Sequence, residues 1–225
     1  MKNFKYDHIY ALTCHCIVRM KTRICEHMRI DDVHVTSSGA MSFTFYGDID
    51  AANALRRSMI SESKSLSIDT LCIKKNTTCV PDEMIAHKLC MIPLKGREHI
   101  LPILGNQERG VSNCVKFHLH VYGRACTSDD LESDCKHVHP VMTFDLLPMK
   151  KDQELHVCAE AVLGTGKKHV MFCPAVAVAY KKITDTEFLF TFETTGAATH
   201  KQILSDAIQS IIESVIVARH NFCAV

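Results

Sequence analysis

The C-terminal segment of the chain has an apolar stripe that is wider than one small sheet normally covers. Between residues 203 and 215, apolar side chains recur at helical spacing over a broad face. They are Ile203, Leu204, Ala207, Ile208, Ile211, Ile212 and Val215. Thr199 and Gln202 have the spacing of a capping box, which marks the start of a helix. We expect this helix to run to Arg219 over a length of about 30 Å. Part of this helix should therefore contact another protein.

A second amphipathic helix is expected near the start of the chain, directly after a strand. Residues 41–45 carry an apolar side chain at every second position, which predicts a strand within residues 28–46. A Gly-Asp pair at 47–48 interrupts this strand, and Asp50 is then expected to cap a helix that begins at Ala51. The small and apolar residues of its stripe are Ala51, Ala54, Leu55, Ser58 and Met59.

The middle of the chain is rich in predicted strands. Alternating or apolar runs place them at residues 115–122, 141–147, 154–162, 175–180 and 187–193. A short helix is expected with Pro81 at its first position, because Asp82 and Glu83 then complement the helix dipole, and Pro93 ends it. Few crossover helices separate the strands, so we expect antiparallel pairing.

The charge balance argues against a chain that holds nucleic acid by itself. Lys plus Arg total 26 and Asp plus Glu total 25, whereas DNA-binding chains usually show a strong basic excess. The polar start at residues 1–7 lacks the apolar core of a secretory signal, and no apolar run is long enough for a transmembrane helix. We therefore expect no direct sequence-specific nucleic-acid binding, no membrane contact, and reduced thiols in the nucleus or cytosol.

Twelve cysteines and fourteen histidines raise the question of a metal site. The candidate clusters are Cys14, Cys16, Cys25 and His27; Cys126, Cys135, His137 and His139; and the strand pair His118 and His120. None contains a C-x-x-C pair, and this many Cys and His residues cluster by chance, so we expect no bound metal and no other cofactor. A stand-alone Cys/His-rich metal-binding or redox protein is the alternative, which bound metal in the isolated monomer would favour.

No catalytic motif is recognisable. The acidic group Asp129, Asp130, Glu132 and Asp134 lies in a polar stretch, which favours a solvated loop over a two-metal catalytic site. Gly164 and Gly166 are not followed by the GK[ST] pattern of a phosphate-binding loop, and no Gly-x-Ser-x-Gly elbow is present. We expect a chain that is not an enzyme by itself.

Four segments of the chain follow one another in the order of a known set of motifs. They are FTFYGDIDAANALRRSMISE at 43–62, NTTCVPDEMIAHKLCMIPL at 76–94, GTGKKHVMFCPAVAVAY at 164–180 and FTFETTGAATHKQILSDAI at 190–208. This collinear set resembles the alpha-like subunits of multisubunit RNA polymerases. The family includes the bacterial alpha subunit and its archaeal counterpart, the third-largest subunit of eukaryotic polymerase II, and the alpha-like subunit shared by polymerases I and III.

The resemblance implies a discontinuous α+β architecture. A helix-on-sheet dimerisation domain would comprise residues 28–62 plus 184–225, and a mainly antiparallel β domain of residues 63–183 would be inserted within it. Residues 1–27 would form an N-terminal extension of unassigned role. This division agrees with the position of the two amphipathic helices on either side of a strand-rich middle.

The resemblance also implies a non-catalytic assembly subunit of DNA-directed RNA polymerase. Such a subunit forms a heterodimer with a small alpha-like subunit and docks on the second-largest subunit. The residues expected at the dimer interface are Leu55, Met59, Ile203, Ile208, Ile211 and Val215. Those expected to face the second-largest subunit are Arg56, Arg57, His169 and Phe172, where arginine offers bidentate pairing with carboxylates. The alternative for the apolar residues is that they cover only the chain's own sheet. The alternative for Arg56 and Arg57 is that they lie on a solvated helix face.

The chain departs from the family pattern in two segments. In the 164–174 segment, Lys168 stands where the family often has an acidic residue, and Val-Met-Phe at 170–172 replaces the usual Ala-Lys-Trp, although His169 remains. The docking contacts of this segment are therefore expected to differ. Residues 95–113 contain no cysteine, so the zinc loop that some eukaryotic members carry there is expected to be missing.

The sequence does not fix which polymerase the chain serves. Phe172 in place of Trp resembles the form shared by polymerases I and III, while the short inserts would also suit a compact viral or parasite enzyme. We expect a nuclear protein, or one in the cytoplasm or virion if it is viral. A homodimer of bacterial type ranks lower, because the sequence ends soon after the dimerisation helix without a linker and DNA-binding tail.

Overall fold

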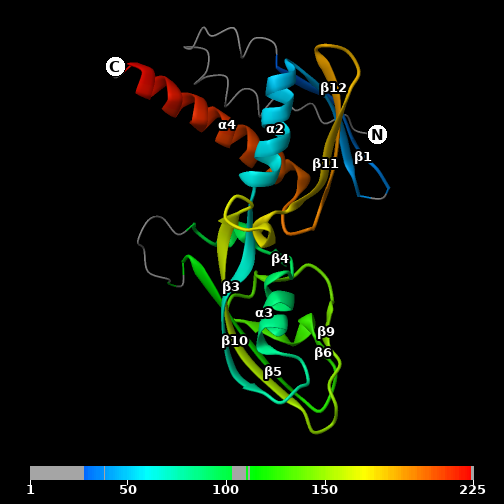
Figure 1. Cartoon of the computed structure of the whole chain (residues 1–225), viewed down its shortest axis with the longest axis vertical. Helices are drawn as coiled ribbons and strands as arrows, with labels where there is room; N and C mark the ends of the chain where they lie inside the picture. Colours follow the sequence, from blue (N-terminus) through cyan, green and yellow to red (C-terminus); the bar gives the residue numbers. More distant parts are fainter. Residues whose placement is uncertain (1–27, 38, 103–109, 111, 224–225) are drawn as a thin grey trace.

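The structure is a computed structural model that describes residues 28–37, 39–102, 110 and 112–223, with the backbone alone for 218–223. The described residues form two halves stacked along the long axis of the molecule (Figure 1). Each half has its own sheet and its own hydrophobic core. Among the described residues, no helix combines the length and apolar character needed to cross a membrane.

The smaller half is built on a four-stranded sheet with the order β1-β2-β12-β11. Its strands are β1 (Arg29–Val35), β2 (Met41–Tyr46), β11 (Ala175–Lys182) and β12 (Glu187–Thr194), all paired antiparallel. Met41, Phe43 and Phe45 of β2 are buried, as the alternation of residues 41–45 predicted. Phe43 stacks on Phe190 of β12 with ring centroids 5.0 Å apart. This aromatic layer is the surface on which the helices of this half pack.

Helix α2 (Ile49–Ser61) packs on this sheet and begins earlier than predicted. Asp48 occupies the N-cap position, so the prediction of Asp50 as cap and Ala51 as first helical residue was wrong. The buried stripe also differs, because Ala52 has no exposed surface whereas Ala54 is exposed. The buried residues of the helix are Ala52, Leu55, Ser58 and Met59.

Helix α4 (His200–Cys223) crosses α2 in the same half. Its start confirms the predicted capping box: the Thr199 N–H donates to Gln202 Oε1 over 2.8 Å, and the Gln202 N–H donates to Thr199 Oγ1 over 3.3 Å. Ile203 and Ala207 are fully buried against the sheet. The helix continues beyond Arg219, where we expected it to end.

The larger half contains a six-stranded sheet with the order β7-β5-β10-β3-β4-β8. In that order its strands are Leu131–Ser133, Cys114–Tyr122, Glu154–Thr165, Lys64–Asn76, Leu94–Lys95 and His139–Pro140. Helix α3 (Asp82–Cys90) covers one face and buries Ile85 and Leu89 in the core. Pro81 is the N-cap of α3 with extended backbone, not its first helical residue as predicted.

The predicted strands are present with one correction, whereas β3 and the short strands β4, β6 (Cys126–Thr127), β7 and β8 were not predicted. All pairs between described strands are antiparallel, as expected, and the α+β fold class is confirmed. Only β9 (Asp145–Leu147), which pairs with β6, forms within the predicted strand 141–147. Strand β3 was not predicted, because buried serines alternate with its apolar residues. Ser65 and Ser67 satisfy their hydroxyls by donating to the carbonyl oxygens of Phe172 and Cys90 over 2.8 and 2.5 Å.

Candidate subunit interface

The C-terminal part of α4 projects beyond the sheet that its first turns cover (Figure 1). In this part Val215, Ile216 and Val217 have exposed fractions of 51%, 49% and 58%. Three consecutive residues point in different directions around a helix, so the helix is apolar over much of its circumference here. We call the half-buried and exposed apolar residues Ile208, Ile211, Ile212, Val215, Ile216 and Val217 the α4 outer surface. A large apolar surface of this kind is typical of a protein–protein contact.

The structure divides the residues that the sequence predicted for the interface into two groups. Leu55, Met59 and Ile203 are at most 3% exposed and pack in the core of the smaller half. Ile208 and Ile211 are half-buried at the edge of that core, and Val215 lies outside it. The first group thus positions the helices, and the second group is accessible to another protein.

The accessible surface extends further than the sequence analysis proposed. Ile216 and Val217 were not among the predicted interface residues, because the apolar stripe was followed only to Val215. On α2, Ile49 and Ile60 are also exposed, by 47% and 36%. Continuing the helical count past Val215 would have identified Ile216 and Val217.

Buried serines hold α2 and α4 together. The Ser58 hydroxyl of α2 donates to the Ala207 carbonyl of α4 over 2.9 Å, and Ser58 is 6% exposed. The fully buried Ser63 hydroxyl donates to the Met59 carbonyl over 2.8 Å and lies 3.4 Å from the Ile203 carbonyl. Small side chains let the helices approach closely, and the buried hydroxyls find backbone acceptors. The direction of α4 is therefore fixed by α2.

A buried ion pair joins α4 to the larger half. Arg97, in the 3-10 helix η1 (Arg97–His99), donates to Asp206 of α4 from Nη1 over 2.7 Å and from Nη2 over 3.1 Å. The Lys64 N–H at the start of β3 also donates to the Asp206 carboxylate, over 3.0 Å, and Arg97 donates to the Lys64 carbonyl. The Arg97 and Asp206 side chains are only 12% and 16% exposed. This bidentate geometry fixes α4 relative to β3.

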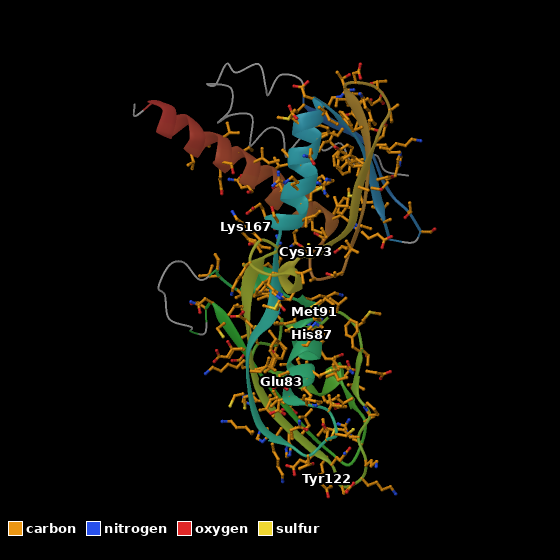
Figure 2. All side chains as sticks on the ribbon, viewed as in Figure 1. Glu83, His87, Met91, Tyr122, Lys167 and Cys173 are labelled. Carbon is orange, nitrogen blue, oxygen red and sulfur yellow. The ribbon has the colours of Figure 1, made fainter. Side chains whose placement is uncertain are left out.

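The chain passes between the two halves through two connections, of which the first is very short. Only Glu62 and Ser63 separate α2 from β3. The return passes by Gly166, where an added Cβ would lie 2.1 Å from the Ile60 carbonyl oxygen. Lys167 and Cys173 lie at this junction (Figure 2), and the Lys167 N–H donates to the Ser61 carbonyl over 2.8 Å. Gly166 is thus required for close contact with the end of α2. This role of Gly166 was not predicted from the sequence.

The four residues predicted to face the second-largest subunit are not equally accessible. Arg57 and His169 are exposed, whereas Arg56 is half-buried and donates to Asn53 Oδ1 over 3.1 Å. Phe172 has no exposed surface, because its ring packs against Gly164 within a small buried cluster. Its predicted place on a docking surface is therefore wrong, and the side chain anchors the segment from inside.

The segment before Phe172 presents other groups to solvent. Lys168 lies with Nζ 5.1 Å from the Phe172 ring centroid and 3.3 Å from Asp69 Oδ1. His169 Nδ1 accepts a hydrogen bond from the Met171 N–H over 3.2 Å, and Val170 is 64% exposed. The exposed surface of this segment thus consists of Lys167, Lys168, His169 and Val170.

The candidate metal clusters do not form a site among the described residues. No three His, Cys, Asp or Glu side chains in the described part of the chain gather as metal ligands. Cys126 is 1% exposed, and burial raises the pKa of its thiol to about 11, while the His137 ring stacks on His99 at 4.4 Å. The cluster of Cys14, Cys16, Cys25 and His27 lies outside the described residues.

The acidic group at 129–134 has structural contacts. Arg124 donates to Asp130 over 2.5 and 3.1 Å, and these bonds lower the pKa of the Asp130 carboxyl. Asp130 also completes a capping box with Thr127, and the Asp129 carboxylate accepts from the Thr143 hydroxyl over 2.7 Å. These contacts account for the two carboxylates as supports of a turn.

The exposed side of α3 carries side chains of the segment 76–94, one of the four segments that resemble the family motifs. Glu83, His87 and Met91 follow one another along this helix and its end (Figure 2), and all three are exposed. Glu83 lies in the first turn, where a carboxylate complements the helix dipole. Lys88, in the last turn, is not part of this row, because its ammonium group donates to the Leu146 carbonyl over 2.7 Å.

Comparison with known proteins gives one consistent family. Residues 47–215 match the RNA polymerase Rpb3/Rpb11 dimerisation domain. The chain is 34% identical to DNA-directed RNA polymerase subunit Rpo3 of Methanocaldococcus jannaschii over 169 residues, which cover 74% of this chain and 82% of that protein. It is 31% identical to Rpo3 of Archaeoglobus fulgidus over 140 residues, covering 60% of this chain but only 53% of that protein. It is 23% identical to human DNA-directed RNA polymerases I and III subunit RPAC1 over 224 residues, covering 85% of this chain and 64% of the human one.

Proposed function

The chain belongs to the family of the RNA polymerase Rpb3/Rpb11 dimerisation domain, and from this membership we propose that it is a non-catalytic assembly subunit of DNA-directed RNA polymerase. The observation that carries the proposal is the α4 outer surface, which lies within or just beyond the matched residues. The alternative of a stand-alone Cys/His-rich metal-binding protein is not supported, because the relatives are polymerase subunits.

The proposed partner at the α4 outer surface is a small alpha-like subunit. A specific interface of standard size buries about 800 Å² per partner with an apolar centre. Ile208, Ile211 and Val215 would lie in that centre, together with Ile216 and Val217. Leu55, Met59 and Ile203 would support it from the core without direct contact.

The proposed contact with the second-largest subunit uses the exposed residues near the junction of the halves. Arg57 and His169 are available for it, and Lys168 adds a cation next to His169 in sequence. Arg56 is held by Asn53 and would contribute through its remaining donors. Phe172 would contribute only indirectly, because its ring contacts the Lys168 ammonium group.

We also propose a revised division into domains. From the sequence, residues 28–62 plus 184–225 are expected in the dimerisation domain and residues 63–183 in the inserted domain. Because β11 pairs with β12, Ala175–Lys182 would instead belong to the dimerisation domain. The boundary would then lie near Pro174, at the end of the connection 166–174 between the halves.

The transcription machinery is the setting that family membership implies. We propose the nucleus for a cellular eukaryotic protein, and the cytoplasm or virion for a viral one. Purification of the tagged chain from its source, followed by identification of the large subunits that accompany it, would name the polymerase. Recovery without any polymerase subunit would contradict the assembly role.

Co-expression with a small alpha-like subunit tests the proposed interface. We expect a one-to-one heterodimer by light scattering after gel filtration, and loss of that complex when Val215→Asp places a carboxylate in the apolar centre. Ile183→Asp is the matched control, because Ile183 is 52% exposed but lies between β11 and β12. A stable homodimer, or a heterodimer that tolerates Val215→Asp, would refute the proposal.

A further inference from the structure

Three chemically reactive side chains lie in one row across the large sheet. Cys158 of β10 is the register partner of Cys72 on β3 and of His118 on β5. Register partners on adjacent strands project from the same face of a sheet. The residues that flank Cys158, Val157 and Ala159, point into the core, so the row lies on the opposite face. Cys72 is exposed and Cys158 is half-buried.

The two cysteines are placed within reach of a disulfide bond. Directly opposed residues of an antiparallel pair have Cα atoms about 4.5–5.5 Å apart. A disulfide requires Cα atoms about 4.4–6.8 Å apart. Both thiols are free in this structure. Cys72 and Cys158 therefore satisfy the main distance condition for a bond without a change in strand pairing.

His118 supplies a proton acceptor for one of the two thiols. Its Nδ1 lies 3.6 Å from Cys158 Sγ. Other cysteines lie in settings less suited to reaction. The Cys173 thiol donates to backbone carbonyls and its pKa is raised by burial, and the same cause raises the pKa of Cys90. Reactive cysteines are instead accessible and have a base or a cation beside them.

We propose that Cys72 and Cys158 form a reversible cross-strand disulfide when the protein meets hydrogen peroxide. This inference does not depend on the assembly role. The row contains two thiols and an imidazole, yet no metal-ligand group forms among the described residues, which favours a redox pair over a zinc site. Oxidation would leave the sheet intact and join the paired strands β3 and β10 covalently.

The reaction balances in two steps. In the first, the Cys158 thiol proton passes to His118 Nδ1, and the Cys158 sulfur attacks one peroxide oxygen. The O–O bond breaks, the leaving hydroxide takes the proton from His118, and a sulfenic acid and one water form. In the second, the Cys72 sulfur attacks the Cys158 sulfur, the S–O bond breaks, and the hydroxyl leaves as water with the Cys72 proton. Two thiols are oxidised by two electrons, and one hydrogen peroxide is reduced to two waters.

Peptide mapping of the full-length chain tests the proposal directly. Trypsin releases residues 65–74 with Cys72 as the only cysteine, and residues 152–167 with Cys158 as the only cysteine. After peroxide treatment and alkylation, we expect these two peptides to be linked and lighter by two hydrogens than their sum. Dithiothreitol should restore both free peptides.

Variants of the chain separate the proposed pair from general oxidation. Cys72→Ser and Cys158→Ser should each abolish the linked peptide, whereas Cys79→Ser, at another exposed cysteine, should retain it. His118→Gln should slow its formation severalfold without changing which peptides are joined. Gel filtration and circular dichroism of each variant would verify that the fold is retained.

Three results would overturn the proposal. One is separate oxidation of Cys72 and Cys158 to sulfinic acids, and a second is preferential linkage of either peptide to another cysteine. The third is protection of both thiols from alkylation by stoichiometric zinc alone, because the row would then be a metal site.

Discussion

In the larger half, α3 lies entirely over its sheet, whereas in the smaller half α4 continues past the sheet that it covers. The apolar residues of α3 that face the sheet, Ile85 and Leu89, are 2% and 1% exposed. At the far end of α4, Ile216 and Val217 are 49% and 58% exposed. Full burial of such a side chain stabilises a protein by about 1.5–3 kcal/mol. In the larger half the apolar side chains of α3 are buried against the chain's own sheet. In the smaller half the apolar side chains at the end of α4 stay exposed and could be buried by a partner.

The largest expected effect comes from the core of the larger half. Phe117→Ala removes a ring with no exposed surface from β5 and should lower the free energy of unfolding by about 3–5 kcal/mol, with or without a partner. Urea denaturation measures the loss. Tyr122→Ala is the control, because Tyr122 lies 64% exposed at the far end of the same strand (Figure 2) and should change stability little. A small loss for Phe117→Ala would mean that this half does not depend on its own core.

A smaller effect is expected at the ion pair that connects the halves. Asp206→Ala removes the carboxylate that accepts from the Arg97 guanidinium and the Lys64 N–H, which should cost about 2–3 kcal/mol. Hydrogen exchange should also increase at the start of β3 and in η1. Asp185→Ala is the control, because the Asp185 side chain is 94% exposed and its pair with Lys182 should contribute little. Equal effects of the two variants would show that the two halves are not held together here.

The next prediction concerns the α4 outer surface alone. Ile216→Ala should weaken the proposed heterodimer about tenfold, or about 1.4 kcal/mol, because it removes apolar contact area from the interface. The unfolding free energy of the isolated chain should change by less than about 0.5 kcal/mol, since Ile216 is exposed there. Calorimetric titration and urea denaturation measure the two quantities. A loss of stability in the isolated chain would show that this part of α4 is already covered.

The smallest effect is a pH dependence that belongs to the larger half. The pKa of Asp130 is lowered by hydrogen bonds from Arg124, so its contribution to stability is present above the unfolded-state pKa of about 3.9. That contribution should be lost as the pH falls through the lower folded-state pKa. Urea denaturation at a series of pH values between about 5 and 2 should show a shallower slope for Asp130→Asn. An unchanged slope would contradict the role of this pair.

The sequence predicted best those elements whose signals are local. The capping residues Thr199 and Gln202 identified the start of α4, and the alternation of Met41, Phe43 and Phe45 identified β2. These signals depend on neighbours within a few residues. They could therefore be recognised without knowledge of the fold.

Contacts between distant segments could not be predicted in the same way. Strand β3 was not recognised because Ser65 and Ser67 look like polar, exposed residues in the sequence. Their hydrogen-bond acceptors, the carbonyls of Phe172 and Cys90, lie far away in sequence. Phe172 was expected at a surface, since nothing local shows that it packs against Gly164 and Val162. The candidate interface was predicted as one stripe, whereas packing against the sheet covers its first part and leaves its last part accessible.

The short connection at Glu62 and Ser63 and the close contact at Gly166 have a mechanical consequence. Only two residues form the first crossing, and in the second Gly166 packs against the Ile60 carbonyl. With Asp206 of α4 bonded to Arg97 and Lys64, α4 is an arm whose base is held at the start of β3. A force applied near Val217 would act through this arm on the start of β3. Whatever binds the tip of α4 would thereby also set the angle at which the large sheet is presented to its surroundings.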